Sequence, residues 1–181
     1  YNNTLTANAP PKIMALGRLA PVKNYPLLID AIYILQTKYD IAAQLIILGD
    51  GNKDALINYA AQKGVKYLPE IRLVDCIYKE LAGADIYTSA CNIESFGLAN
   101  REAVSYGLPC VVSAGGANCE VLGNGAWLVP NEAIHFAEAY NSLLTNSNLR
   151  LFWNKQALYS SQQWPSWKAI IRNYEQALLS L

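Results

Sequence analysis

The amino-acid sequence predicts an α/β fold, a Rossmann-like three-layer sandwich built on a parallel sheet of about six strands. Short apolar runs alternate along the chain with longer stretches of helical periodicity. The runs are apolar at successive positions, which is typical of strands buried on both faces. Most of them end at glycine or a polar residue, as strands do before a turn. Hydrophobic residues make up 52% of the 181 residues, which is enough for a core and excludes a disordered chain.

In the first half of the chain, strands and helices are expected in strict alternation. The helix after the first strand is the best marked, because its apolar residues recur three or four positions apart. The expected strands are Ile13–Leu16, Gln44–Leu48 and Val65–Leu68. The expected helices are Tyr25–Tyr39, Lys53–Lys63 and Asp75–Ala82.

The second half continues the pattern. Its expected strands are Asp85–Ser89, Cys110–Ser113 and Ala126–Val129. A helix over Gly97–Tyr106 separates the first two, and two or three helices are expected within residues 131–181. In a parallel sheet with right-handed crossovers, the loops that follow the strands meet at one edge, and ligands bind there.

The polar, asparagine-rich start of the chain, residues 1–11, ends in Pro10-Pro11 and is expected to be the remnant of an interdomain linker. The chain lacks an initiator methionine, which indicates a fragment of a longer protein. Residues 12–181 are then expected to form one domain.

Charge and composition exclude several classes of function. Lys plus Arg and Asp plus Glu number 14 each, so the chain lacks the basic excess of a nucleic-acid-binding protein. No apolar run approaches the roughly 20 residues that cross a bilayer. The four cysteines have no C-x-x-C spacing and His135 is the only histidine, so no metal site is expected. Reduced cysteines are typical of a cytoplasmic protein.

Two cations follow the first expected strand. Gly17 allows the backbone to turn closely around a ligand, and Arg18 and Lys23 come before the next helix. Arginine binds phosphate oxygens in a bidentate manner and lysine acts as a point charge, so the pair could clamp a diphosphate. Two surface cations near a helix start are the alternative.

Two glutamates, Glu94 and Glu102, flank a predicted anion site at a helix start. Ser95 can cap that helix, and Gly97 gives a ligand access to the free backbone N–H groups. Carboxylates would repel a phosphate there, but they can hold hydroxyl groups on either side of it. The alternative is that Glu94 pairs with the helix dipole and Glu102 is solvated.

The order of these motifs closely resembles the C-terminal domain of family 4 glycosyltransferases, which are retaining, two-domain enzymes of the GT-B architecture. The resemblance runs from about residue 12 to residue 130. The residues that carry it are Gly17-Arg18-Leu19, Lys23-Asn24, Gly49-Asp50-Gly51, Glu94–Ala103, Gly107–Val112, Gly115-Gly116 and Glu120.

The resemblance implies a role for each site residue. Arg18 and Lys23 would bind the donor diphosphate and stabilise the leaving nucleoside diphosphate, and Glu94 would hold hydroxyls of the transferred sugar, which makes these three the expected catalytic residues. Glu102 would bind the ribose. The remaining expected donor contacts are Gly17, Gly51, Phe96, Gly97 and Leu98, with the base near residues 49–51 and 69–72.

The resemblance also implies partners. The donor would be a UDP- or GDP-linked sugar, with no other cofactor and no metal. The acceptor would be a glycan or a lipid-linked glycan of surface polysaccharide (lipopolysaccharide) biosynthesis. Trp164-Pro165-Ser166-Trp167 and the helix after it resemble the family tail that crosses to an N-terminal acceptor-binding domain. Without that domain the isolated chain, a hexosyltransferase half, is expected to be inactive. The full-length protein is expected in the cytoplasm, peripheral at the inner membrane.

Three other readings of the sequence compete with this one. A non-catalytic nucleotide- or sugar-binding module of the same fold is expected to lack some of Arg18, Lys23, Glu94 and Glu102, and all four are present. A receiver-type or flavodoxin-like domain is expected to carry an acidic cluster or a phosphate loop after the first strand. A dinucleotide-binding domain would carry G-x-G-x-x-G there, and this chain carries Gly17-Arg18 instead.

Overall fold

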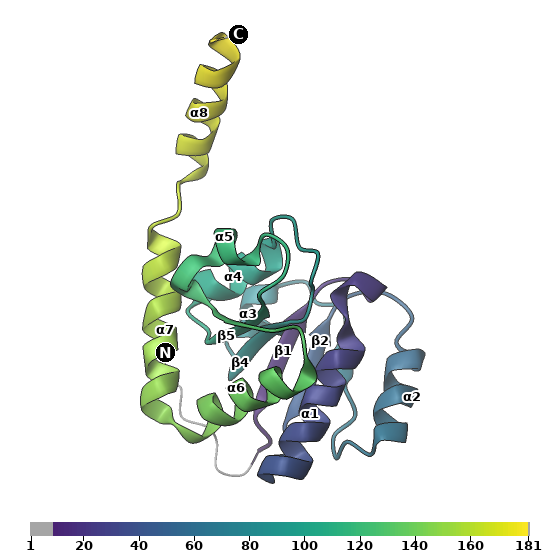
Figure 1. Ribbon diagram of the computed structural model, residues 1–181. Coiled ribbons are helices and arrows are strands. Elements are labelled where there is room, and N and C mark those ends of the chain that lie inside the picture. The colour runs from purple at the N-terminus through teal and green to yellow at the C-terminus, as the bar shows by residue number, and fades with distance from the viewer. Residues whose placement is uncertain (1–8, 181) are drawn as a thin grey trace.

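The computed structural model describes residues 9–180, and in them a six-stranded parallel sheet lies between two layers of helices (Figure 1). The strand order is β3-β2-β1-β4-β5-β6. The strands are β1 (Lys12–Leu16), β2 (Gln44–Leu48), β3 (Glu70–Arg72), β4 (Ile86–Ser89), β5 (Cys110–Ser113) and β6 (Trp127–Val129). The predicted Rossmann-like sandwich with six parallel strands is confirmed.

The helices follow the predicted alternation, with small shifts at their ends. They are α1 (Tyr25–Tyr39), α2 (Asp54–Lys63), α3 (Ile77–Leu81), α4 (Leu98–Tyr106), α5 (Asn118–Leu122), α6 (Ala133–Thr145), α7 (Ser147–Gln162) and α8 (Trp167–Leu179). Short 3-10 helices are η1 (Pro21–Lys23) and η2 (Gly123–Gly125).

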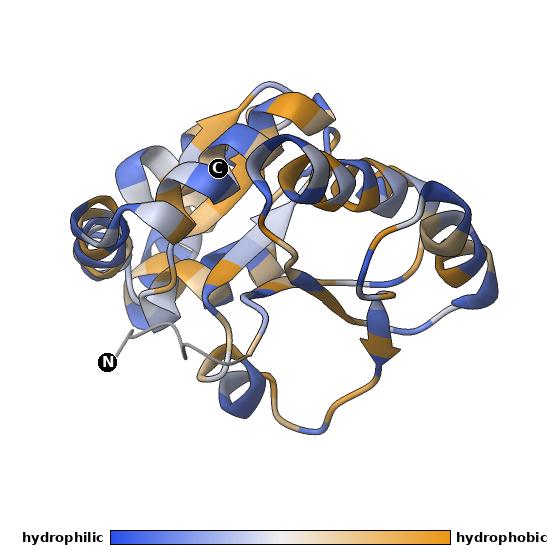
Figure 2. Ribbon diagram, turned by 90° about the horizontal axis from the view of Figure 1, so that it is seen from below, coloured by the Kyte–Doolittle hydropathy of each residue, from blue (hydrophilic) through white to orange (hydrophobic). Residues whose placement is uncertain are grey.

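The two faces of the sheet each form a hydrophobic core. Successive side chains of a strand point to opposite faces, so Ile13 and Ala15 of β1 join the core under α1 and α6, while Met14 and Leu16 join the core under α3, α4 and α5. The helices of both layers turn hydrophobic residues inward and hydrophilic residues outward, as the hydropathy colouring in Figure 2 shows. Burial on both faces explains why the strands are apolar throughout.

The predicted strand over Val65–Leu68 is wrong, and β3 lies just after it. Val65 is buried in the core beside α1, and Leu68 receives a hydrogen bond to its carbonyl from the Gln44 side chain. Pro69 has no N–H to donate to a neighbouring strand, so pairing with β2 begins only at Glu70. Only Val65 of this segment is buried, so its apolar residues did not mark a strand.

The strand order reverses between β1 and β4, since β1 pairs with β2 on one side and with β4 on the other. In open parallel sheets, the loops beyond the carboxyl ends of strands diverge at such a point and leave a crevice for ligands. The loops after β1 and β4 and the start of α4 carry the predicted site residues, except Gly51, which follows β2. Most of the expected linker, residues 1–11, lies outside the described residues.

Helix α8 stands away from the body of the domain, beyond the end of α7 (Figure 1). None of its residues is buried. One side of the helix carries Trp167, Ile171, Tyr174 and Leu178, all exposed and spaced at about one helical turn. A helix with such an apolar side and no partner in residues 9–180 is suited to pack against another surface.

Candidate functional site

The centre of the site is an ion pair between the loops that follow β1 and β4. Lys23 Nζ donates to Glu94 Oε2 at 2.8 Å, although the two residues are 71 positions apart in the chain. Lys23 ends η1, directly after β1, and Glu94 lies between β4 and α4. Their side chains are only 24% and 14% exposed, respectively, so the pair is largely shielded from solvent. The structure therefore joins two residues that the sequence placed in separate motifs.

The surroundings of Glu94 favour its ionised form. Partial desolvation acts to raise the pKa of this carboxyl group, but the hydrogen bond and charge of Lys23 act against it, and the net pKa is lowered. The Cys91 thiol and the Gly97 backbone N–H add hydrogen bonds that lower the pKa further. At neutral pH Glu94 is thus a fixed carboxylate.

This lowered pKa predicts how stability depends on pH. A carboxyl group with a depressed pKa in the folded state contributes stability above its unfolded value, about 4.3, and loses it as the pH falls toward the folded value. We expect Glu94→Gln to be less stable than the wild type at pH 7, with the difference shrinking below about pH 5. Urea unfolding at several pH values measures it.

Glu138→Gln is the matched control, because Glu138 pairs with Lys38 across 3.5 Å on an exposed surface, where a pair contributes little. A stability difference for Glu94→Gln that stays constant from pH 7 to pH 3 would contradict the assigned ion pair.

Gly17, Tyr25 and Lys23 form the wall of the site beneath β1. Gly17 has φ +136°, and a Cβ there would lie 3.3 Å from Lys23 Cε. The absence of a side chain at Gly17 therefore leaves room for the Lys23 side chain. The buried Tyr25 hydroxyl donates to the Gly17 carbonyl at 2.7 Å, and burial raises the pKa of Tyr25, which keeps it a donor. Sequence reasoning missed Tyr25.

Arg18 lies beside this wall with its side chain exposed. In residues 9–180 it has no ion pair and no side-chain hydrogen bond, so the guanidinium is available to a ligand at the edge of the sheet. It differs in this from Lys23, which already has one partner.

Helix α4 begins at Gly97, which adopts a left-handed conformation with φ +67°. The expected cap by Ser95 is wrong: the N-cap residue is Gly97, no side chain caps the helix, and Ser95 is exposed. Ser95 lies two residues before the N-cap position, so its side chain does not cap the helix. Phe96 and Leu98 are 43% and 61% exposed beside the free N–H groups of the first turn.

Glu102 lies one turn after Leu98 on α4 and is half-buried. Burial is the main cause that raises the pKa of the Tyr87 hydroxyl. The negative charges of Glu94 and Glu102 raise it further. Glu94 and Glu102 thus both lie near the same buried residue.

The Gly51 turn lies next to β3 and to the Arg18 loop. Leu19 N donates to the Asp50 carbonyl at 2.8 Å, and Gly49 N donates to the Arg72 carbonyl at 3.0 Å. A Cβ at Gly51 would come within 2.7 Å of Leu19 Cβ. The structure therefore gathers the two segments expected near the base, while the guanidinium of Arg72 is bound by Glu80 at 2.6 and 2.9 Å.

A buried polar network lies under the β4–α4 loop, and sequence reasoning missed it. Asn100 accepts from the Tyr87 hydroxyl at 2.7 Å and donates to Asn118 Oδ1 at 3.0 Å. Asn118 donates to the carbonyls of Cys91 and Ser113. The signal in the sequence was an amide residue, Asn100, in the first turn of a helix next to apolar core positions, where a buried amide needs a partner.

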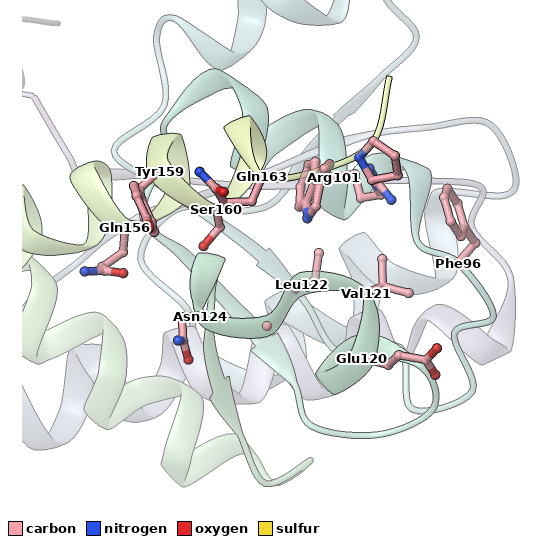
Figure 3. A pocket seen from close by; sticks show the side chains of 13 residues that line it. Phe96, Arg101, Glu120, Val121, Leu122, Asn124, Gln156, Tyr159, Ser160 and Gln163 are labelled. Atoms are coloured by element: carbon pink, nitrogen blue, oxygen red, sulfur yellow. The ribbon is translucent and has the colours of Figure 1, made fainter. Parts of the chain in front are cut away.

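A separate cavity of about 490 Å³ lies on the flank of the domain, between α4, α5, η2 and the end of α7 (Figure 3). The Arg101 guanidinium lies over the rings of Phe96 and Trp164, at 4.9 and 4.0 Å from their centroids. Glu120 lines this cavity. Only Phe96 is shared with the predicted site.

Residues 9–180 contain neither a group of potential metal ligands nor a helix that could cross a membrane. No three His, Cys, Asp or Glu side chains of this part of the chain come together in a group able to hold a metal ion. No helix described here is both long enough and apolar enough to cross a membrane.

Comparison with known proteins identifies the family. Residues 2–158 match the model of the family described as glycosyl transferases group 1. The chain belongs to this family. It is similar to sucrose-phosphate synthase 4 of Arabidopsis thaliana, with 27% identity over 188 residues that cover 91% of this chain and 18% of the relative. The spinach sucrose-phosphate synthase is also 27% identical, over 80% of this chain and 16% of its own.

Solved structures of glycosyltransferases share the fold. The catalytic domain of the cholesterol-alpha-glucosyltransferase from Helicobacter pylori superposes with a TM-score of 0.70 and 26% identity, covering 86% of this chain and 100% of that one. HepE from Anabaena, solved with UDP-glucose, gives 0.81 and 23%, covering 97% of this chain and 50% of HepE. The chain thus has the fold of half of a GT-B glycosyltransferase, and it spans less than a fifth of the curated relatives it matches.

Proposed function

We propose that this chain is the donor-binding domain of a retaining glycosyltransferase and that it binds a UDP-linked sugar in the crevice between the loops after β1 and β4. The observation that carries the proposal is the 2.8 Å pair of Lys23 and Glu94 beside the first turn of α4. It combines a cation, free backbone N–H groups and a carboxylate, which are the groups needed to bind a diphosphate and a sugar.

The diphosphate would be bound by Arg18, Lys23 and the N-terminus of α4. An ammonium group has three donors and Glu94 uses one, so two remain for phosphate oxygens. Arg18 is exposed at the same edge. During transfer, negative charge develops on the departing nucleoside diphosphate, and fixed cations at that position stabilise it.

Glu94 is suited to hold sugar hydroxyls, because it is ionised and its second carboxylate oxygen, Oε1, is not used by Lys23. Glu102 is proposed to bind the ribose, and Phe96, Gly97 and Leu98 to line the donor site. The base is proposed to lie beside Gly51. Uridine is favoured because a structural relative, HepE, was solved with UDP and with UDP-glucose.

The acceptor side is proposed to come from a further domain that packs on α8. Support comes from the exposed apolar side of α8, which contains Trp167, Ile171, Tyr174 and Leu178, and from solved relatives about twice as long as this chain. The acceptor proposed from the family resemblance is a glycan or lipid-linked glycan of surface polysaccharides, which would place the whole protein in the cytoplasm at the inner membrane. The chain alone is proposed to transfer no sugar.

Calorimetric titration of the chain with UDP, GDP and ADP tests the donor site. We expect UDP to bind most tightly and Arg18→Ala to weaken it about tenfold, the loss typical of one hydrogen bond to a charged group. Lys63→Ala is the matched control, since Lys63 pairs with Asp30 at 2.7 Å on α1 and α2, outside the crevice. If no nucleotide binds to the folded chain, or if both variants bind like the wild type, the proposed site is wrong.

The proposed ribose contact gives a sharper prediction. We expect the wild-type chain to bind UDP about tenfold more tightly than 2′-deoxy-UDP, and we expect Glu102→Ala to abolish this preference by weakening UDP alone. The same calorimeter measures all four affinities. A preference for UDP that survives in Glu102→Ala would move the ribose away from this residue.

A further inference from the structure

The β4–α4 loop, which carries Glu94, is hydrogen-bonded to the buried side chain of Asn118. Asn118 begins α5 and is 1% exposed. Its Nδ2 donates to the Cys91 carbonyl at 3.3 Å and to the Ser113 carbonyl at 2.9 Å, and its Oδ1 accepts from Asn100 Nδ2 at 3.0 Å. One amide therefore ties together the end of β4, the end of β5 and helix α4.

Cys91 connects this amide to Glu94. Its carbonyl accepts a hydrogen bond from Asn118, and its thiol lies close enough to the Glu94 carboxylate for each group to shift the pKa of the other. Cys91 is 1% exposed, so the segment has little room to shift. Three residues on, the Glu94 carbonyl accepts from Ala117 N at 2.8 Å, which ties the loop to the residue before Asn118.

The turn at Gly115 and Gly116 packs closely against the same loop. A Cβ at Gly116 would lie 2.5 Å from the Glu94 carbonyl oxygen, and one at Gly115 would lie 1.8 Å from Asn92 Oδ1. Asn92 Oδ1 also accepts from the Ser113 hydroxyl at 3.1 Å. The backbone of the Ser113–Asn118 turn thus fits closely under residues 92–94.

We propose that Asn118 is a positioning residue for the sugar contact: by bonding the Cys91 carbonyl and Asn100, it holds the Glu94 carboxylate in place between Lys23 and the start of α4. The inference rests on the proposed function, because Glu94 is the proposed sugar ligand. Asn118 touches no donor group itself. Its removal is expected to affect the sugar more than the nucleotide, since Arg18 and Lys23 lie on the loop after β1, and the bond from α4 to Asn118 comes from Asn100, not from Glu102.

The first test needs no ligand and follows the thiol of Cys91. Iodoacetamide labelling of the folded chain, read peptide by peptide by mass spectrometry, reports how often Cys91 becomes accessible. We expect Asn118→Ala and the better-filling Asn118→Leu to speed labelling of Cys91 about tenfold, because both lose the two donated bonds. Labelling of Cys110 is expected to stay slow, because its thiol is buried in β5 and donates a hydrogen bond to the Leu108 carbonyl.

The second test compares UDP with UDP-glucose in the same variants. We expect the gain in affinity that glucose adds over UDP to fall about fivefold, with a smaller loss of affinity for UDP itself. Asn154→Ala is the control: Asn154 is a second buried asparagine, on α7, and its Oδ1 has no partner among the described residues.

Each outcome decides a different question. Unchanged labelling of Cys91, or equal acceleration of Cys91 and Cys110, overturns the positioning role, as does an equal loss of UDP and UDP-glucose affinity. If the wild-type chain binds neither ligand, the proposed function fails, and the labelling result alone then decides whether Asn118 holds the loop.

Discussion

Lys23→Ala is expected to weaken UDP binding about 100-fold, or about 2.7 kcal/mol. Two effects add. The phosphates lose a cation with two free donors, and Glu94, 14% exposed and no longer paired, becomes an uncompensated carboxylate beside them. Isothermal calorimetry with UDP measures the loss.

A double variant separates the two effects. Lys23→Ala with Glu94→Gln removes the cation and the uncompensated charge together, so we expect it to bind UDP several-fold more tightly than Lys23→Ala alone. Lys63→Ala keeps the wild-type affinity, because Lys63 lies on α2, away from the crevice. Equal affinities for the single and double variants would show that Glu94 does not face the phosphates.

Gly49→Ala is expected to destabilise the chain by about 3 kcal/mol, at the upper end for inserting a methyl group into packed structure. Its Cβ would lie 1.9 Å from the Gly17 carbonyl oxygen and 2.7 Å from the Gly17 carbonyl carbon. Both are backbone atoms, and the loops are fixed by bonds from Gly17 N to the Leu48 carbonyl and from Gly49 N to the Arg72 carbonyl, each 3.0 Å. Urea unfolding followed by circular dichroism measures the change.

Gly83→Ala is the matched control, since the nearest atom to a Cβ there is the Glu80 carbonyl oxygen at 3.5 Å, an ordinary contact. We expect it to unfold within about 1 kcal/mol of the wild type. Gly49 packs against Gly17, which is a proposed donor contact. The fraction of Gly49→Ala protein that remains folded is therefore also expected to bind UDP more weakly. Stability equal to that of Gly83→Ala would contradict the close approach of the two turns.

Much of the architecture could be predicted from the sequence because it is set by local patterns. Helix α1 was predicted with its observed ends, since its apolar residues repeat at helical spacing and the chain leaves the helix at Asp40 in a left-handed conformation. The strands β2 and β5 were also predicted with their observed ends, because they are runs that are apolar at successive positions. The prediction of a strand over Val65–Leu68 failed, because apolar composition alone does not distinguish a strand from an irregular, partly buried segment.

The candidate site was predicted as separate motifs. Gly17-Arg18, Lys23 and the Glu94–Glu102 segment could be found because each has residue types suited to phosphates or hydroxyls. That Lys23 pairs with Glu94 could not be found, because the contact depends on β1 and β4 being neighbours in the sheet. Strand order is decided by which faces bury together, and no local pattern records it.

The sequence by itself determined the α/β class, the apolar strands, most helices and the residue types of the site, because periodicity, turn residues and charge are local properties of the chain. Only the tertiary structure decided that Lys23 meets Glu94, that Tyr25 binds the Gly17 carbonyl and that Asn118 supports the loop of Glu94. Each of these contacts joins side chains to segments brought together by packing. A polar side chain in the interior must bond to whatever group the fold places beside it, and that group is known only once the chain is folded.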